Sequence, residues 1–589
     1  MNPRPDSSAS YRPGRLSGRV LGAAIGLAGR AADTAGDLAV KASEAGRAVG
    51  VMQRAGLIPV TRPDHGVRSL ISLSRYGPFV GAAKHAAAMT PDRAGIIDEA
   101  GPLTFAELDN RSNALARAWQ AQGLGQGSVI SALCRDHRGL VLTMLAAGKI
   151  GARLVMLNTG FAAPQLADVC HREGTEALVY DSEFAELLSA IPDSVARFLS
   201  WVDAPEDPDR VAPRLDIDGV PTLDELIGAN STAATRPPSK PGGFVLLTSG
   251  TTGTPKGAPR ERTSVFASAQ FLDRIPLRPD GVTFMAAPIF HGTGVSQFII
   301  SIALGCTVVL NRRFDPEATV AGVAEHGADA LIVVPTMLQR IVDLGPEVLD
   351  KYDTSSLRII FSAGSAISPD LSRRTEELFG PVLYNLYGST EVAVATVATP
   401  DELRAAPGTA GRPPVTCEVR LYDENDRQIT EPNVPGRIFV RSGLSFAGYT
   451  DGRHKTLIDG LLSIGDLGYF DPTGLLFIVG RDDDMIVSGG ENVFPQEVEH
   501  LLVERPDVLE AGVVGVEDEA FGQRLRAVVV LDGEVPTGAE AEAKVEELKD
   551  FVRANLARYK IPREIVFVDR LPRNATGKLL KNKLIELEY

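Results

Sequence analysis

From about residue 70 to residue 479, short apolar runs typical of strands alternate with stretches in which apolar and polar positions follow a helical period. Short runs of apolar and β-branched residues predict buried strands at 129–133, 154–157, 244–247, 307–310, 331–334 and 358–361. Stretches with helical periodicity lie between them, for example at 105–122 and 369–379. This alternation predicts an α/β fold in which helices cover parallel sheets. Ligands of such folds bind at the carboxyl ends of the strands.

The pattern changes beyond Arg481. Strand-like runs at 508–516, 524–531 and 564–568 accompany one charged helical stretch at 540–558, which predicts a compact α+β unit. A chain of 589 residues is too long for one hydrophobic core. We therefore expect a leader at 1–65, a large domain at 66–482, and a small mobile C-terminal domain at 483–589.

The first 60 residues carry eight Lys and Arg residues against four Asp and Glu residues. From residue 15 to residue 54 they are rich in Ala, Leu and Val and contain no proline. Two interpretations stay open. The segment could form a basic amphipathic helix on an anionic membrane surface, or a leader that packs on the body or nowhere.

The composition disfavours several classes of protein but does not identify one function. The net charge of −15 gives no support for a nucleic-acid partner, and an anionic ligand would need local positive charge. The four cysteines show neither disulfide nor zinc spacing, which predicts reduced, buried thiols and a reducing cytosol. We find no run of about 20 apolar residues that would predict a membrane-spanning helix.

A loop rich in glycine and threonine follows the strand predicted at 244–247. Its glycines let backbone N–H groups approach an anion, its hydroxyls donate hydrogen bonds, and its lysine adds positive charge. The order Lys-Gly differs from the Walker loop, which ends in Gly-Lys-Ser/Thr. An isolated match of this kind could also be a flexible loop. The segment reads Thr248-Ser249-Gly250-Thr251-Thr252-Gly253-Thr254-Pro255-Lys256-Gly257.

This loop resembles the phosphate-loop signature of the adenylate-forming superfamily, which includes acyl-CoA synthetases, luciferases and nonribosomal peptide adenylation domains. Three later segments are similar to the other signatures of that family and occur in the same order. The resemblance spans most of the chain from about Leu103. The segments are Tyr387-Gly388-Ser389-Thr390-Glu391, Gly465-Asp466 followed by Gly480-Arg481-Asp-Asp-Asp-Met-Ile, and Pro572-Arg-Asn-Ala-Thr-Gly577-Lys578.

The resemblance implies that the chain binds ATP. Tyr387 would stack on adenine, Asp466 would accept hydrogen bonds from the ribose hydroxyls, and Arg481 would assist. Glu391 and the hydroxyl of Thr248 would hold Mg²⁺, which needs few protein carboxylates. The remaining nucleotide-binding residues implied are Ser249, Gly250, Thr251, Thr252, Gly253, Lys256, Gly364, Ser365, Ala366, Gly388, Ser389 and Thr390.

The resemblance also implies roles for the C-terminal part. Lys578 would stabilise the charge that develops at phosphorus during adenylation, a contribution of roughly 3–4 kcal/mol. The small domain would then rotate about Asp483. Ser488, Gly489 and Gly490 would line the path of CoA, because glycines leave room for a pantetheine arm.

The segment around His291 bears on the substrate. By resemblance His291 belongs to the catalytic set, as a wall or gate near the reacting carboxylate. No acid occurs between Met285 and Leu304, which disfavours an amino acid as substrate. Val295, Phe298, Ile299, Ile300 and Leu304 could line a fatty chain or simply form core.

The predicted function is ATP-dependent activation of a fatty acid and its transfer to CoA, as in medium- and long-chain acyl-CoA synthetases. Residues 488–495 are similar to the pattern of those enzymes. Two alternatives stay open: an acyl-AMP ligase that serves a carrier protein, and a non-catalytic binding protein that retains the fold. The absence of Gly-x-Ser-x-Gly and of a dinucleotide fingerprint disfavours a hydrolase or reductase.

Overall fold

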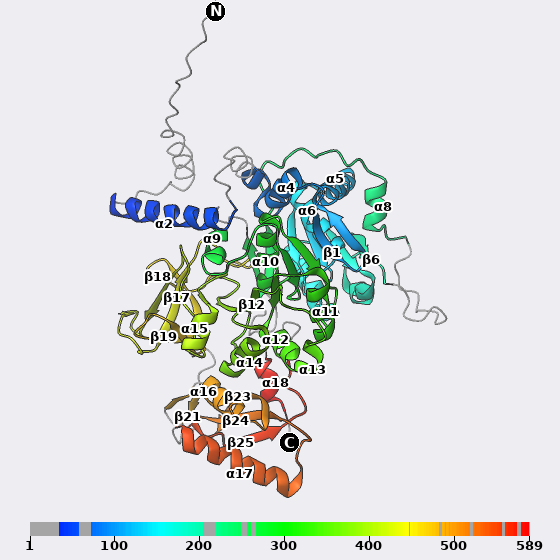
Figure 1. The fold of residues 1–589 in the computed structure, drawn as a ribbon. Coiled ribbons are helices and arrows are strands. Elements are labelled where there is room, and N and C mark those ends of the chain that lie inside the picture. The colour runs from blue at the N-terminus through cyan, green and yellow to red at the C-terminus, as the bar shows by residue number, and fades with distance from the viewer. Residues whose placement is uncertain are drawn as a thin grey trace, which may run out of the picture.

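The computed structural model describes residues 35–57, 72–203, 219–248, 256–260, 267–446, 448–481, 486–488, 491–493, 495–518, 522–556, 560–573 and 579–587. Three sheets and their helices make a large body, and the C-terminal residues make a smaller unit below it in Figure 1. The predicted fold class, an α/β body followed by a small α+β unit, is confirmed.

The first sheet has eight strands in the order β14-β13-β12-β11-β9-β10-β1-β2. The six strands from β13 to β1 pair in parallel, and β14 and β2 pair antiparallel at the two edges. The bounds are β1 Ala94–Asp98, β2 Gly101–Thr104, β9 Val282–Met285, β10 Thr307–Leu310, β11 Ala330–Val333, β12 Ile359–Ala363, β13 Leu383–Tyr387 and β14 Thr396–Ala398.

The second sheet has six strands in the order β6-β5-β3-β4-β7-β8, of which only β8 is antiparallel to its neighbour. The bounds are β3 Val129–Leu133, β4 Arg153–Met156, β5 Ala177–Asp181, β6 Ala196–Trp201, β7 Phe244–Thr248 and β8 Lys256–Arg260. β7 and β8 frame residues 249–255, which lie outside the described residues.

One large apolar core joins the two sheets through α4 (Pro78–Met89), α5 (Phe105–Ala121), α6 (Arg138–Ile150) and α10 (Gly292–Ala303). The opposite face of the first sheet is covered by α11 (Pro316–His326), α12 (Pro335–Val342) and α14 (Pro369–Phe379). The outer face of the second sheet is covered by α7 (Ala163–Glu173) and the 3₁₀ helix η1 (Ser182–Ala190). Shorter helices are α8 Leu223–Gly228, α9 Ala267–Leu272, α13 Pro346–Leu349 and α15 Pro400–Ala405.

The strands and helices predicted in this part of the chain are confirmed, with ends that shift by up to two residues. β3, β10 and α14 have the predicted bounds. The predicted helix at 105–122 is α5, which begins at a capping box in which Thr104 and Glu107 satisfy each other's backbone N–H groups.

The third sheet differs from the parallel pattern expected up to residue 479. It is antiparallel, and no helix lies between β15 and β20 in the described residues. Hairpin turns explain this, because Asp459 and Gly460 between β18 and β19 both have positive φ. The bounds are β15 Glu418–Tyr422, β16 Gln428–Ile429, β17 Gly436–Arg441, β18 Leu457–Ile458, β19 Leu461–Phe470 and β20 Leu476–Arg481.

The small unit contains the three strands predicted from sequence, and its helix ends three residues earlier than expected, at Asn555. Its helix α16 contacts β20 of the large body. The bounds are β21 Ile486–Ser488, β22 Glu491–Val493, β23 Val508–Asp518, β24 Gly522–Leu531, β25 Glu564–Phe567, α16 Pro495–Val503, α17 Gly538–Asn555 and α18 Lys581–Ile585.

A helix from the leader, α2 (Ala35–Arg54), lies against the large body. Ala48, Val51 and Met52 near its C-terminal end are buried, and the helix contacts α9 (Figure 1). Within the described part of the chain, no helix combines the length and apolar character needed to cross a membrane.

Both tryptophans of the chain lie beside the second sheet. Trp119 of α5 is fully buried, with its ring centroid 5.9 Å from that of Phe198. Trp201, at the end of β6, lies 4.9 Å from the His137 ring.

The four cysteines are free, and three of them are buried. Burial raises the pKa of Cys170 to about 11 and that of Cys306 to about 12, so these thiols stay protonated near neutral pH. Both properties agree with the expected buried, reduced thiols.

Candidate active site

Loops from both parallel sheets meet at the carboxyl ends of their strands. A methyl group placed on Gly364, which follows β12, would lie 4.0 Å from Thr293 Oγ1. One placed on Gly292 would lie 3.9 Å from Leu246 of β7. The segment after His291 is therefore close both to the turn after β12 and to the strand that enters the glycine-rich loop.

The second and third signatures meet at Tyr387. Its hydroxyl donates a 2.5 Å hydrogen bond to Asp466 Oδ2, and Arg481 Nε lies 3.7 Å from Asp466 Oδ1. Asp466 and Arg481 face each other on β19 and β20. Burial, and then the Asp466 carboxylate, raise the pKa of Tyr387, so the hydroxyl stays a donor. Side chains 79 residues apart thus form one hydrogen-bonded group.

Gly388 allows the sharp turn that follows Tyr387. A Cβ atom there would lie 2.2 Å from the carbonyl oxygen of Ala393, so any other residue would force the backbone apart. The turn closes through hydrogen bonds from Ala393 N to Ser389 O at 2.7 Å and from Ala395 N to Tyr387 O at 2.9 Å. Tyr387 and Glu391 are thereby held in one tight loop.

Glu391 is buried and held by a tyrosine that lies 58 residues further along the chain. The hydroxyl of Tyr449 donates a 2.5 Å hydrogen bond to Glu391 Oε1. Burial opposes ionisation of Glu391, but hydrogen bonds from Tyr449 and Ser389 outweigh it and lower the pKa of the carboxyl group. On the ring of the same tyrosine, Lys256 Nζ lies 5.3 Å from the centroid. Tyr449 thus contacts both the lysine of the first signature and the glutamate of the second.

A second contact fixes the strand that leaves the glycine-rich loop. Thr450 N donates to Gly257 O at 2.9 Å, and Thr450 Oγ1 donates to Glu173 Oε1 at 2.8 Å. A Cβ atom on Gly257 would lie 2.5 Å from Thr450 Oγ1 and 2.8 Å from Glu173 Oε1, so a larger residue there would displace this hydrogen-bonded pair. Residues 449–450 therefore tie β8 to α7 as well as to Glu391.

His291 occupies the position just before α10 without a capping hydrogen bond from its side chain, and its ring lies 4.3 Å from that of Phe290. Its Nε2 atom is buried and has no hydrogen-bond partner among the described residues. Burial lowers the pKa of His291 to about 4, so the imidazole is neutral near pH 7. A neutral imidazole whose Nε2 atom has no partner among the described residues is more compatible with a wall or gate of the site than with the role of a charged group.

Two buried polar residues at this edge were missed in the sequence. Asp136 follows β3 and accepts hydrogen bonds from Ile289 N at 3.1 Å with both carboxylate oxygens. These bonds fix the backbone two residues before His291. Asn385 lies two positions before Tyr387 on β13, and its Oδ1 has no partner among the described residues. Neither residue belongs to a run that the sequence marks as unusual.

Part of the predicted site lies outside the described residues: Ser249 to Pro255, Asp483, Gly489, Gly490 and Lys578. The side chains of Thr248 and Ser488 are also outside the description. Gly364, Ser365 and Ala366 form an exposed turn. The roles expected for all these residues stay predictions.

The donor set fits a magnesium ion held mainly by substrate. No group of three or more His, Cys, Asp or Glu side chains that could hold a metal occurs in the described parts of the chain. Glu391 is a single buried carboxylate, and Mg²⁺ commonly uses one or two carboxylates together with phosphate oxygens.

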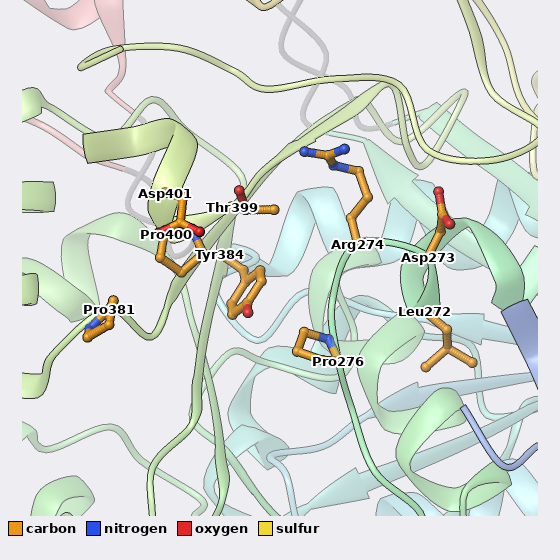
Figure 2. A pocket seen from close by; sticks show the side chains of 9 residues that line it. All are labelled: Leu272, Asp273, Arg274, Pro276, Pro381, Tyr384, Thr399, Pro400 and Asp401. Atoms are coloured by element: carbon orange, nitrogen blue, oxygen red, sulfur yellow. The ribbon is translucent and has the colours of Figure 1, made fainter. Parts of the chain in front are cut away.

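A pocket of about 420 Å³ lies elsewhere on the large body. Figure 2 shows Tyr384 of β13 pointing toward Pro276, with Arg274 and Thr399 nearby. Tyr384 and Tyr387 project from opposite faces of β13, because side chains alternate along a strand. None of the predicted site residues lines this pocket.

Two family models match the chain. The model of AMP-binding enzymes matches residues 83–450, and that of the AMP-binding enzyme C-terminal domain matches residues 497–578.

Individual relatives align with most of the chain. The 2-succinylbenzoate–CoA ligase of Bacillus subtilis is 31% identical over 503 residues, 85% of this chain and 96% of the relative. The indoleacetate–CoA ligase of Aromatoleum aromaticum is 32% identical, with coverage of 85% and 96%. The structure of the o-succinylbenzoate CoA synthetase of Bacillus subtilis in complex with its acyl-adenylate intermediate superposes with a TM-score of 0.72, at 28% identity, covering 86% of this chain and 98% of that one.

Proposed function

Because the chain belongs to the family of AMP-binding enzymes, we propose that it uses ATP to activate a carboxylic acid as an acyl-adenylate and then transfers the acyl group to CoA. The observation that carries this proposal is the meeting of Tyr387, Asp466 and Arg481 beside the group formed by Glu391, Tyr449 and Lys256.

The first group suits a nucleoside. Tyr387 offers an aromatic face to adenine, Asn385 offers an acceptor to its amino group, and Asp466 accepts from the ribose hydroxyls. The second group suits phosphates, because Lys256 follows a loop rich in N–H and hydroxyl donors.

Glu391 and the hydroxyl of Thr248 would hold Mg²⁺, which when bound would neutralise charge on the phosphates that leave as pyrophosphate. Tyr449 keeps the carboxylate of Glu391 ionised and oriented. His291 remains neutral and would shield the reacting carboxylate from water.

Lys578, Asp483 and the segment Ser488-Gly489-Gly490 complete the proposal as predicted from sequence. Lys578 would act in adenylation, Asp483 would serve as the hinge, and the glycine segment would admit CoA.

An aromatic acid is our first candidate for the substrate, because the named relatives are ligases of 2-succinylbenzoate and indoleacetate. The fatty acid expected from sequence is the second. The side chains expected to line a fatty chain belong largely to the main core, and Phe298 packs on Phe79 of α4 with ring centroids 5.4 Å apart. That packing removes one reason for the fatty-acid interpretation.

The decisive experiment measures AMP release from ATP with aryl acids and with fatty acids of several lengths, each with and without CoA. We expect CoA-dependent turnover with at least one aryl acid. Turnover with fatty acids alone would reverse the order of the two candidates.

The same assay separates the remaining alternatives. AMP release with acyl transfer only to a carrier protein would indicate an acyl-AMP ligase. No AMP release with any acid, from a folded protein that still binds ATP, would favour a non-catalytic binding protein.

A further inference from the structure

A lysine outside all four signatures lies inside the candidate site. Lys455 is partly buried, whereas the residues on either side of it, His454 and Thr456, are exposed. A Cβ atom on Gly465 would lie 3.9 Å from Lys455 Nζ and 3.5 Å from Arg481 Nη2, so the two cations flank the residue that precedes Asp466.

The hairpin between β18 and β19 explains how Lys455 reaches this place. Leu457 pairs with Leu462, and Ser463 N donates to Thr456 O at 2.9 Å. The antiparallel register therefore continues toward Lys455 on one side and Gly465 on the other. An Asp-Gly turn with positive φ at both residues sets that register.

Lys455 also acts on the other half of the site. It is among the groups that lower the pKa of Glu391, after the hydrogen bonds from Tyr449 and Ser389 and against the effect of burial. Glu391 and Asp466 already have partners in Tyr449 and Tyr387. No ion pair within 4.0 Å joins Lys455 to another described side chain.

A nucleotide in this site would run from the ribose, at Asp466, to the metal-bound phosphates, at Glu391. The α-phosphate, which is bonded to the ribose, would lie between these two carboxylates. We propose that Lys455 binds the α-phosphate of the nucleotide and of the acyl-adenylate. This inference rests on the proposed function.

The net charge of the chain and the position of Lys455 in the large body support such a contact. The chain carries a net charge of −15, so an anionic ligand needs local cations to be attracted. Lys455 belongs to the large body, whereas Lys578 belongs to the small unit. Lys455 would therefore keep its contact with the adenylate whatever position the small unit takes.

Binding of AMP and of adenosine to the full chain tests the contact, because the two ligands differ only by the phosphate. Lys455→Met keeps the length of the side chain and removes its charge. We expect it to weaken AMP binding about tenfold, as for a charged hydrogen bond, and adenosine binding less than about twofold. Lys455→Arg should restore most of the AMP affinity.

Lys351→Met is the matched control, since Lys351 is an exposed lysine whose partner is Glu317, away from the site. It should change neither affinity. Calorimetry gives both dissociation constants, and the melting temperature checks that each variant is folded. Equal weakening of AMP and adenosine by Lys455→Met, or an unchanged AMP affinity, would overturn the inference. A wild-type protein that binds neither ligand would overturn the proposed function itself.

Discussion

At the scale of single residues, Tyr449 is the residue that links the first signature to the second. Its hydroxyl donates a hydrogen bond to Glu391 and its ring contacts the ammonium group of Lys256. One side chain therefore positions an anionic and a cationic group that come from different signatures. Sequence reasoning missed it, because a tyrosine in a loop carries no local mark of its partners. The signatures themselves were visible, because each is a run of several unusual residues.

Tyr449→Phe tests this positioning role. It keeps the ring near Lys256 and removes only the hydroxyl donor, so Glu391 should lose its orientation. We expect the KM for ATP and the Mg²⁺ concentration needed for half-maximal ATP binding to rise about tenfold, which corresponds to about 1.4 kcal/mol. The KM for the acid should change little.

Tyr352→Phe is the matched control for that variant. Tyr352 donates a 2.9 Å hydrogen bond to Glu317 of α11 and so also forms a tyrosine–carboxylate pair, outside the groups that make up the candidate site. Equal effects of the two substitutions on ATP binding would mean that the Tyr449 hydroxyl only stabilises the fold.

Asp136 gives a prediction about pH. Burial raises the pKa of this carboxyl group to about 7 in spite of the hydrogen bond from Ile289 N. The folded state therefore holds the proton more tightly than the unfolded state, whose pKa is near the ordinary value of 3.8. Stability contributed by protonated Asp136 is complete below about pH 4 and is lost as the pH rises to about 7.

Asp136→Asn should remove this dependence while it keeps an acceptor for Ile289 N. The variant should gain stability relative to the wild type between pH 4 and pH 7, by at most about 4 kcal/mol, because one pKa unit corresponds to about 1.4 kcal/mol. Melting temperatures of both proteins across that range measure the gain. A constant difference between them would contradict the expectation.

At the scale of elements, the strands were easier to predict than the way they pair. Runs such as 129–133 and 307–310 consist mainly of apolar and β-branched residues and are buried throughout, which is typical of strands covered on both faces. The third sheet escaped prediction because its strands mix buried and partly exposed positions and its hairpins depend on turn residues rather than on long apolar runs. Yet that sheet supplies Asp466, Arg481 and Lys455.

Helix α2 also shows what a sequence leaves open. Its C-terminal half is docked on the large body through Ala48, Val51 and Met52. A membrane contact by residues 1–60 would therefore have to use the part before this docked end. Removal of residues 1–60, followed by sedimentation with anionic vesicles, tests that contact, and unchanged partitioning would exclude it.

The docking of α2 is itself testable. Val51→Ala combined with Met52→Ala should lower stability by about 2 kcal/mol or more, since buried methyl groups are lost. Arg47→Ala, on the exposed side of the same helix, should have little effect. Thermal unfolding distinguishes the two variants, and equal melting temperatures would mean that α2 is not docked in solution.

At the scale of the whole molecule, the proposed reaction requires both the large body and the small unit. Arg481 is the last residue of β20, and residues 482–485 lead from it into the small unit that carries Lys578. We expect Lys578→Ala to reduce adenylation about 10²–10³-fold while thioester formation from supplied acyl-AMP persists. Pyrophosphate exchange reports the first step, and exchange near the wild-type rate would refute the role of Lys578.

Asp483→Pro should restrict the junction and block only one of the two half-reactions. Assays of pyrophosphate exchange and of thioester formation from supplied acyl-AMP, each run separately, test this. Intact overall turnover would exclude a hinge at that residue.

The placement of both tryptophans has a practical result for spectroscopy. Trp119 and Trp201 lie beside the second sheet, and the small unit contains no tryptophan. Intrinsic fluorescence will therefore follow the unfolding of that sheet and would be insensitive to the proposed rotation of the small unit. Phe551→Trp, at a ring that lies 5.3 Å from the guanidinium of Arg505, would give the small unit its own optical signal.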